Sequence, residues 1–221
     1  MKRECTAPAC SRETSAWGRY CNTHKSRARR HGHPLQQAVT KGELRPYLTA
    51  VDAVVDRNTD SPLWELAGQR WDALVRHCQA TVAAYWAGKP MRRWDRLAAE
   101  EIVKLAEHVD AQVVLRMVCA VYLLQERDPR RFRSDDAFRH QLVRRCRGLT
   151  DVNAGTWFDN ATGRVKRAYR DLAPKAALAM GGMLAEVLGP VGTKIAQLDR
   201  DRANREWQQR KALGVALRGL R

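Results

Sequence analysis

The amino-acid sequence predicts an all-α helical domain preceded by a small zinc-stapled finger. Three cysteines and one histidine stand close together near the start of the chain. Farther along, apolar residues recur at helical spacing, and no stretch alternates convincingly between apolar and polar residues. With 221 residues, of which 44% are hydrophobic, the chain can bury a core of ordinary size. We therefore divide it into a zinc finger (1–34), a linker with a short helix (35–61) and an all-α helical domain (62–221).

The finger contains four candidate metal ligands in the spacing C-x4-C-x10-C-x2-H, namely Cys5, Cys10, Cys21 and His24. Three thiolates and one imidazole form a closed ligand set for a structural Zn²⁺ ion. A segment of this length cannot bury a useful core, so a metal is the expected source of its stability. Trp17 and Tyr20 are large enough to pack around the ion as a miniature core.

A metal is not the sole role that this cluster could have. A disulfide framework would leave one of the three thiols unpaired, and a chance grouping would have to place half of the six cysteines within 17 positions. His31 or His33 could replace His24 as the fourth ligand. We favour His24, because the C-x2-H spacing places both ligands in the first turn of a helix that Asn22 could cap.

The finger also combines a C-x-x-P-x-C segment, a glycine turn before C-x-x-H, and a basic R-x-R-R-H-G-x-P tail. The matching residues are Cys5, Pro8, Cys10, Gly18, Cys21, His24, Arg27, Arg29, Arg30, His31, Gly32 and Pro34. In this pattern the first 34 residues resemble the short fingers at the front of phage and mobile-element proteins, of which HNH homing-type endonucleases are the best-known hosts. The resemblance implies zinc ligation and a nucleic-acid setting. It does not carry the nuclease with it, because His77, His108 and His140 each stand alone in a predicted helix.

The net charge of +16 and the isoelectric point of about 10.2 indicate a polyanionic partner. Residues 1–46 have 10 Lys and Arg against 3 Asp and Glu, and residues 128–170 have 11 against 5. Residues 47–127, which separate them, have 10 against 11, and residues 171–221 have 9 against 5. Two basic blocks around a neutral spacer are expected when two surfaces face one phosphate backbone, and solvated faces are the alternative.

The second basic block contains a well-specified helix at Ser134–Arg147, which Ser134 can cap and Gly148 can end. Its inner face should consist of Phe138, Leu142 and Cys146, and its other faces should present Arg139, His140, Gln141, Arg144, Arg145 and Arg147. Such side chains can reach phosphates and base edges in a major groove. The candidate nucleic-acid-binding residues of the chain are Arg19, Lys25, Arg27, Arg29, Arg30, Arg130, Arg131, Arg133, Arg139, Arg144, Arg145, Arg147, Arg164, Lys166, Arg167 and Arg170.

The remaining elements follow from helical periodicity and from start and stop signals. We expect helices at about 44–57, 62–87, 95–108 and 110–128, with Ser61 and Asp110 as caps and the last of them as the most buried. A turn-rich loop at 149–161 should precede a helix at 163–172, in which Tyr169 faces the core. A small-residue helix should begin at residue 174, where Gly181-Gly182 allows close packing, and a separate last helix should follow Gly189-Pro190.

Several function classes find no support in the sequence. The start of the chain has no apolar secretory segment, the longest apolar runs are interrupted by charges, and the isolated Cys78, Cys119 and Cys146 indicate buried thiols in a reduced, cytoplasmic setting. No motif of a common enzyme class is present. Asp151, Asn153 and Asp159 could bind a metal in their loop, and this is the weaker interpretation of those residues.

We therefore expect a zinc-containing DNA-binding protein, a non-catalytic regulator or accessory factor of a phage or mobile element. Aromatic and basic residues are not interleaved as a single-strand stacking platform requires, which favours double-stranded DNA, while RNA stays open. The alternative is a phage-type factor that binds RNA polymerase or another host protein. The last helix turns polar around Trp207 and ends in an apolar segment, which suggests a partner surface, a homo-oligomer contact or a frayed end. Nuclease activity is kept as a third hypothesis.

Overall fold

Our computed structural model describes residues 3–15 and 17–219, without the side chains of residues 167, 214, 216, 218 and 219. Most of these residues are helical, as predicted. The helices are α1 (Asn22–His31), α2 (Lys41–Arg57), α3 (Pro62–Trp86), α4 (Arg93–His108), α5 (Ala111–Arg127), α6 (Asp135–Arg147) and α7 (Pro174–Gly219). Two 3-10 helices are η1 (Pro129–Arg131) and η2 (Asp151–Asn153). Two antiparallel strand pairs are β1 (Arg3–Glu4) with β2 (Glu13–Thr14), and β3 (Ala154–Asp159) with β4 (Arg164–Tyr169).

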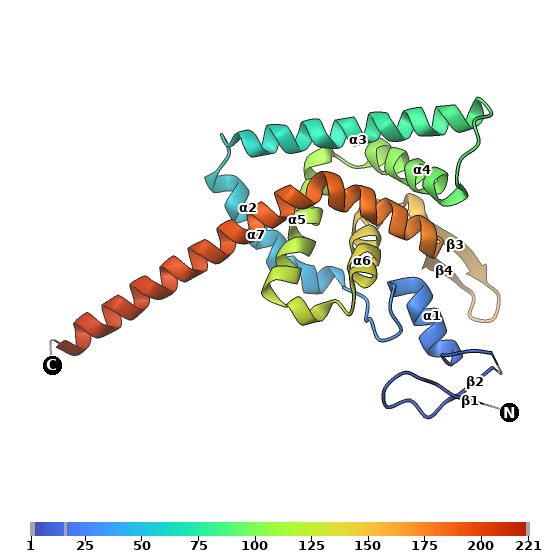
Figure 1. Cartoon of the computed structure of the whole chain (residues 1–221), viewed down its shortest axis with the longest axis horizontal. Coiled ribbons are helices and arrows are strands. Elements are labelled where there is room, and N and C mark those ends of the chain that lie inside the picture. Colours follow the sequence, from blue (N-terminus) through green and yellow to red (C-terminus); the bar gives the residue numbers. More distant parts are fainter. Residues whose placement is uncertain (1–2, 16, 220–221) are drawn as a thin grey trace.

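The body of the molecule forms around α5, which the sequence predicts to be the most buried helix. Its buried side chains surround the helix and include Leu115, Val118 and Leu124. α5 packs against α2 and α7, and α7 also packs against α3, α4 and α6 (Figure 1). The core therefore lies where α5 and α7 meet, and the remaining helices of the body cover this pair.

Side-chain caps fix the points at which helices begin. Ser61, Asp110 and Ser134 each accept a backbone hydrogen bond at the start of α3, α5 and α6, as predicted. α2 begins three residues earlier than expected, because Thr40 and Glu43 form a capping box in which each side chain bonds the other residue's backbone N–H.

The expected break at Gly189-Pro190 is wrong, because α7 continues through it. A proline inside a helix removes one backbone hydrogen bond, so other contacts must hold the helix together there. Gly189 and Gly192 lie directly against the Tyr122 side chain of α5, and a Cβ atom on Gly192 would come within 2.7 Å of its ring. These glycines therefore allow close helix packing instead of a turn.

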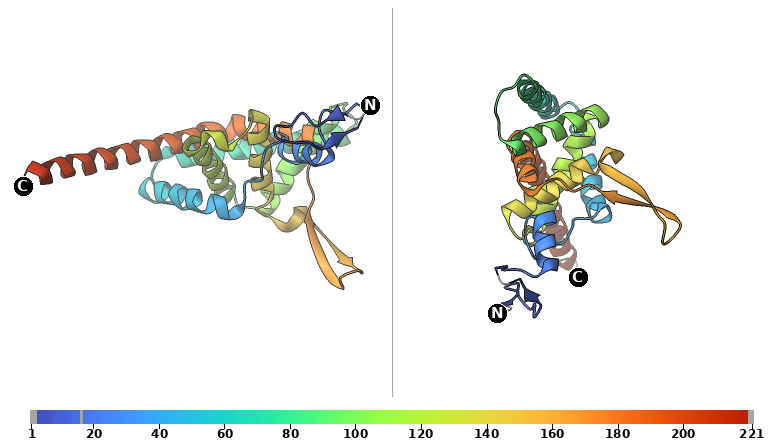
Figure 2. Two further views of the ribbon diagram at one scale, coloured as in Figure 1. Left: turned by 90° about the horizontal axis from the view of Figure 1, so that it is seen from below. Right: turned by 90° about the vertical axis from the view of Figure 1, so that its right-hand side faces the viewer.

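The two ends of α7 have different surroundings. In its first half Met180, Leu184 and Leu188 are fully buried. Of the two glycines predicted to allow close packing, Gly181 packs on Arg139, whereas a Cβ atom on Gly182 would meet no described atom within 4 Å. Its last part extends beyond the body (Figures 1 and 2). Residues 174–213 are long and apolar enough to pass for a membrane span, but half of the most apolar window is buried in the body.

The predicted loop at 149–161 and helix at 163–172 are wrong, because these segments form the β3–β4 hairpin. Threonine, tryptophan, phenylalanine and valine favour strands, and Gly163 adopts a positive φ of 61° in the turn between them. Both faces of the outer part of the hairpin are exposed, so its sequence lacks the apolar–polar alternation that marks a half-buried strand. The hairpin projects from the body (Figure 2).

Candidate metal centre and basic surface

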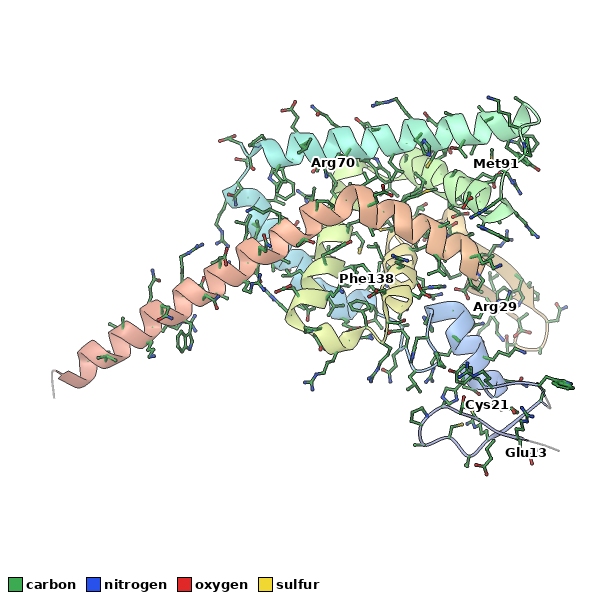
Figure 3. All side chains as sticks on the ribbon, viewed as in Figure 1. Glu13, Cys21, Arg29, Arg70, Met91 and Phe138 are labelled. Atoms are coloured by element: carbon green, nitrogen blue, oxygen red, sulfur yellow. The ribbon has the colours of Figure 1, made fainter. Side chains whose placement is uncertain are left out.

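The four candidate ligands come from both ends of the finger. Cys5 follows β1, Cys10 lies in the segment between β1 and β2, and Cys21 precedes α1 as its N-cap residue. His24 lies in the first turn of α1. The expectation that Asn22 caps this helix is wrong, because Asn22 is its first residue. Figure 3 shows Cys21 where the strand segment meets α1.

The ligand atoms of this cluster are close enough to share one metal ion. All four lie within 4.8 Å of one another. The Sγ atoms of Cys10 and Cys21 are 4.0 Å apart, and the Nδ1 atom of His24 lies 3.4 Å from Cys5 Sγ and 3.3 Å from Cys21 Sγ. Two sulfurs bound tetrahedrally at about 2.3 Å lie about 3.8 Å apart, so these distances suit a tetrahedral site.

The surroundings of the three thiols shift their pKa values. Burial raises the pKa of Cys5, but the backbone N–H groups of Cys21 and Ala7, together with the thiols of Cys10 and Cys21, leave this pKa lowered. The backbone of His24, at the positive end of α1, lowers the pKa of Cys21. The backbone of Arg12 acts in the same direction on Cys10, yet burial and the adjacent thiols leave its pKa raised. Deprotonating all three thiols therefore requires a positive charge among them, which a bound metal ion supplies.

The other two candidate histidines have different partners. The Nδ1 atom of His31 is 3.1 Å from the Nε2 atom of Gln141 on α6, and the Nδ1 atom of His33 accepts a hydrogen bond from the Leu35 N–H at 3.2 Å. Burial first, and then the positive charge of Arg144, lower the pKa of His31 to about 4. His24 is therefore the histidine placed to bind the metal, as the C-x2-H spacing indicates.

The expected miniature core forms only in part. Cys5, Ala7 and Cys21 are buried, and Tyr20 and Leu35 pack against them. Trp17, in contrast, is 94% exposed, so the prediction that it packs around the metal is wrong. The finger is too small to cover two large aromatic side chains, and this core is separate from that of the body.

The finger is docked on the body through α1 and α6. Gly32 ends α1 with a positive φ of 78°, and a Cβ atom there would lie 2.6 Å from the carbonyl oxygen of Asp136. Arg30 forms an ion pair with Asp171 at 3.2 Å. The chain then continues through the fully buried Gln36, whose side chain bonds the backbone of Arg131 and Arg133. These contacts fix α1 beside the second basic block.

Of the six α6 residues expected to face outward, only Arg139 is exposed, so most of this prediction is wrong. His140, Gln141 and Arg147 are buried, because α6 lies between α1, α5 and α7 and has little free surface. Gln141 accepts a hydrogen bond from the Val39 N–H at 2.8 Å, and burial lowers the pKa of His140. A helix enclosed by neighbours on several sides cannot enter a groove of DNA.

Several candidate basic residues are engaged inside the protein. Arg147 pairs with Glu101 at 2.6 Å, and Arg144 pairs with Asp171. Arg131 pairs with Glu43, and its guanidinium also bonds the carbonyl of Ala38. Arg145 is half-buried, whereas Arg139 is exposed and lies 4.0 Å from Asp136 on the same helix. Arg131, Arg144 and Arg147 thus hold elements of the body together.

The other candidates are at the surface. The exposed ones are Arg19, Lys25, Arg29, Arg30, Arg130, Arg133, Arg164, Lys166 and Arg170, and Arg27 is half-exposed. The side chain of Arg167 lies outside the described part of the structure. Arg130 and Arg133 line an open cavity of about 370 Å³ together with Leu35 and Gln37, which follow the finger. The structure thus brings the end of the finger and the start of the second basic block together.

Three candidate functional residues were missed in the sequence. They are the exposed apolar residues of the hairpin, Trp157, Phe158 and Val165. The available signal was a pair of strand-forming segments around the turn Asp159–Gly163. Tyr169 does face the protein interior, but from β4 and beneath Arg144 and Arg147. Asp159 bonds Lys166 and Thr162 within the hairpin, which accounts for this carboxylate without a metal.

The cluster Cys5, Cys10, Cys21 and His24 is thus positioned to hold a metal ion, on a finger that is attached to a basic helical body. Comparisons with models of protein families, with curated proteins and with solved structures find no match.

Proposed function

We propose that this protein is a zinc-containing, non-catalytic DNA-binding factor of regulatory or accessory type. The observation that carries the proposal is the placement of α1. Its start holds two of the four ligands, its surface carries Lys25 and Arg29, and the segment that follows it lies beside Arg130 and Arg133. A metal ion in the finger would therefore order one continuous set of cations for a phosphate backbone.

The proposed metal is Zn²⁺, held by Cys5, Cys10, Cys21 and His24. Three thiolates and an imidazole are soft and borderline ligands, and a closed tetrahedral set of this kind suits a structural zinc ion. With all four positions taken by the protein, the ion would have no open position for substrate. Its role would be to stabilise the finger, in agreement with a non-catalytic function.

Duplex binding is tested by measuring the dissociation constant against salt concentration, with the zinc-loaded protein and a mixed-sequence duplex. Six to ten phosphate contacts predict roughly a thousand-fold loss of affinity between about 50 and about 200 mM salt. Selecting bound sequences from a random duplex pool would then identify a preferred site. An affinity that does not change with salt would refute the proposal.

Charge-removing variants locate the surface. Lys25→Gln, Arg29→Gln and Arg133→Gln should each weaken binding and reduce the salt slope by about one. The control is Arg76→Gln, an exposed site on α3, which lies on the side of the body away from the finger (Figure 1). Equal effects at all four positions would indicate a non-specific response to net charge, contrary to the proposed surface.

A second candidate function is binding to a host protein such as RNA polymerase. Trp207, Leu213 and Leu217 lie toward the end of α7, are exposed, and are not among the described residues that form the core or pack against it. Capture from a lysate treated with nuclease separates the two candidates. Partners retained after this treatment and lost in a Trp207→Ala, Leu213→Ala variant would favour this second function, whereas partners lost with the nucleic acid would favour DNA binding.

A further inference from the structure

The β3–β4 hairpin has exposed apolar side chains that do not contribute to the hydrophobic core. Trp157 is 49% exposed, Phe158 is 59% exposed and Val165 is 69% exposed. None of them belongs to the core of the body or packs against it. Among the described residues, β3 and β4 pair only with each other, so the outer part of the hairpin has solvent on both faces. An unsupported two-stranded hairpin is marginally stable in water, so this one needs support from its base.

The base of the hairpin is held firmly by Arg147. This buried guanidinium donates hydrogen bonds of 2.9 Å to the Tyr169 hydroxyl, to the Arg170 carbonyl and to the Asn153 side chain. Asn153 in turn accepts the Arg170 N–H through its carbonyl at 2.8 Å. Glu101 on α4 neutralises the arginine. The hairpin is thus a rigidly attached arm with a free tip.

The arm is also basic. Residues 154–170 contain four Lys and Arg against one Asp, a net charge of +3. The strand register places Trp157 opposite Lys166 and Asp159 opposite Arg164, so Trp157 shares its face with two cations and with one carboxylate, which pairs with Lys166. On the other face Phe158 lies opposite Val165, which forms an apolar pair next to the turn. Interleaved aromatic and basic residues, absent from the linear sequence, arise from strand pairing.

We infer that the β3–β4 hairpin is a DNA-binding arm, which inserts into a groove of the duplex and places Phe158 and Val165 against the base pairs. A two-stranded ribbon fits the width of the major groove, and apolar side chains at the end of such elements act as wedges between base steps in the minor groove. The surrounding cations match the phosphates on either side. The arm projects from the body with both of its faces exposed (Figure 2), a shape that can enter a groove. This inference rests on the proposed function.

The arm and the finger are placed to contact one duplex. Both project from the same end of the molecule, opposite the free end of α7, and they leave the body in different directions (Figures 1 and 2). Asp171, two residues beyond β4, pairs with Arg30 of α1 and with Arg144 of α6. Finger, arm and body are therefore tied together at one junction, and a duplex bound there would receive contacts from both projections.

The test compares the zinc-loaded protein with a Phe158→Ala, Val165→Ala variant in duplex binding and duplex bending, the latter measured by energy transfer between end-labelled DNA. The variant should bind about tenfold or more weakly and should bend the duplex less. Both positions are outside the core, so the melting temperature should be unchanged. Trp86→Ala, an exposed aromatic on α3, is the matched control and should keep full affinity and bending.

The outcomes separate the two proposals. If the wild-type protein does not bind duplex DNA in a salt-dependent manner, the proposed function fails. If it binds and the hairpin variant binds and bends DNA equally well, only the arm is refuted. If the double variant unfolds, Arg164→Gln decides, because an inserted arm predicts a salt slope reduced by about one. Tighter binding of the arm to single-stranded than to duplex DNA would also overturn the inference.

Discussion

The guanidinium group of Arg147 donates a 2.9 Å hydrogen bond to the hydroxyl of Tyr169 and so joins the last residues of α6 and β4. The sequence predicts these residues on two helices, with Arg147 facing DNA. In the structure the arginine is buried and serves the hairpin. The second basic block therefore supplies buried side chains that stabilise the fold as well as exposed cations.

Replacing Arg147 should destabilise the protein strongly. Arg147→Met would leave Glu101 with Lys104 as its remaining cation and the Asn153 side-chain oxygen without its donor, at a cost of more than about 2 kcal/mol in the free energy of unfolding. Urea denaturation measures this change. Arg133→Met, at an exposed site, should change the same quantity by no more than about 0.5 kcal/mol. Similar values for the two variants would contradict the role of Arg147 as the support of the hairpin.

Removing one metal ligand should unfold the finger and spare the body. The wild-type protein should contain one zinc ion per chain, and Cys10→Ser should contain much less. The two hydrophobic clusters are separate, so the far-ultraviolet circular dichroism of the variant should fall only slightly, through α1. Metal analysis and the dichroism spectrum of the same preparation check both points. Collapse of the whole spectrum would show that finger and body fold as one unit.

A side chain at Gly32 should destabilise the contact between the finger and the body. Gly32→Ala combines a positive φ with contact at 2.6 Å to a backbone carbonyl, so it should cost at least about 1–2 kcal/mol or detach α1 from α6. Gly68→Ala, within α3, is the control. A Cβ atom there meets no described atom within 4 Å, and the change should stabilise the helix by up to about 1 kcal/mol. Limited proteolysis between finger and body would report detachment.

Acidification should weaken this junction through His31. Its folded-state pKa of about 4 lies below the usual 6.5, because burial and the nearby Arg144 disfavour the charged ring. Between these values the unfolded chain binds a proton that the folded chain does not, so stability falls as the pH drops from about 6.5 to about 4. His31→Gln should lose less stability over this range. Melting temperatures at matched pH values test the difference, since His140, whose pKa burial also lowers, is present in both proteins.

The features that were predictable from the sequence depend on local chemistry. Ser61, Asp110 and Ser134 cap helices because a short polar side chain at that position needs only neighbouring backbone N–H groups. The ligand cluster was also predictable, because its spacing is typical of residues that share one metal ion. The metal's identity and the DNA contacts stay predictions, which metal analysis and duplex titration test.

The errors concern features that depend on distant partners. Gly189-Pro190 looks like a helix break until Tyr122, 67 positions earlier, occupies the space that the glycines leave. Arg147 looks exposed until Glu101 and Asn153 surround it. Local periodicity contains no information on such contacts, and the two-sided exposure of the hairpin removed the alternation that would have revealed its strands.

Because α7 continues through Pro190, it is one long helix that joins the body to the far C-terminal end of the molecule. A helix of 46 residues is about 70 Å long, and its two ends cannot move independently as they would if a hinge divided it. If the proposed duplex binds at the finger end of the molecule, a partner docked at the far end of α7 would be held at a fixed distance and direction from it, and the protein would act as a spacer as much as a clamp.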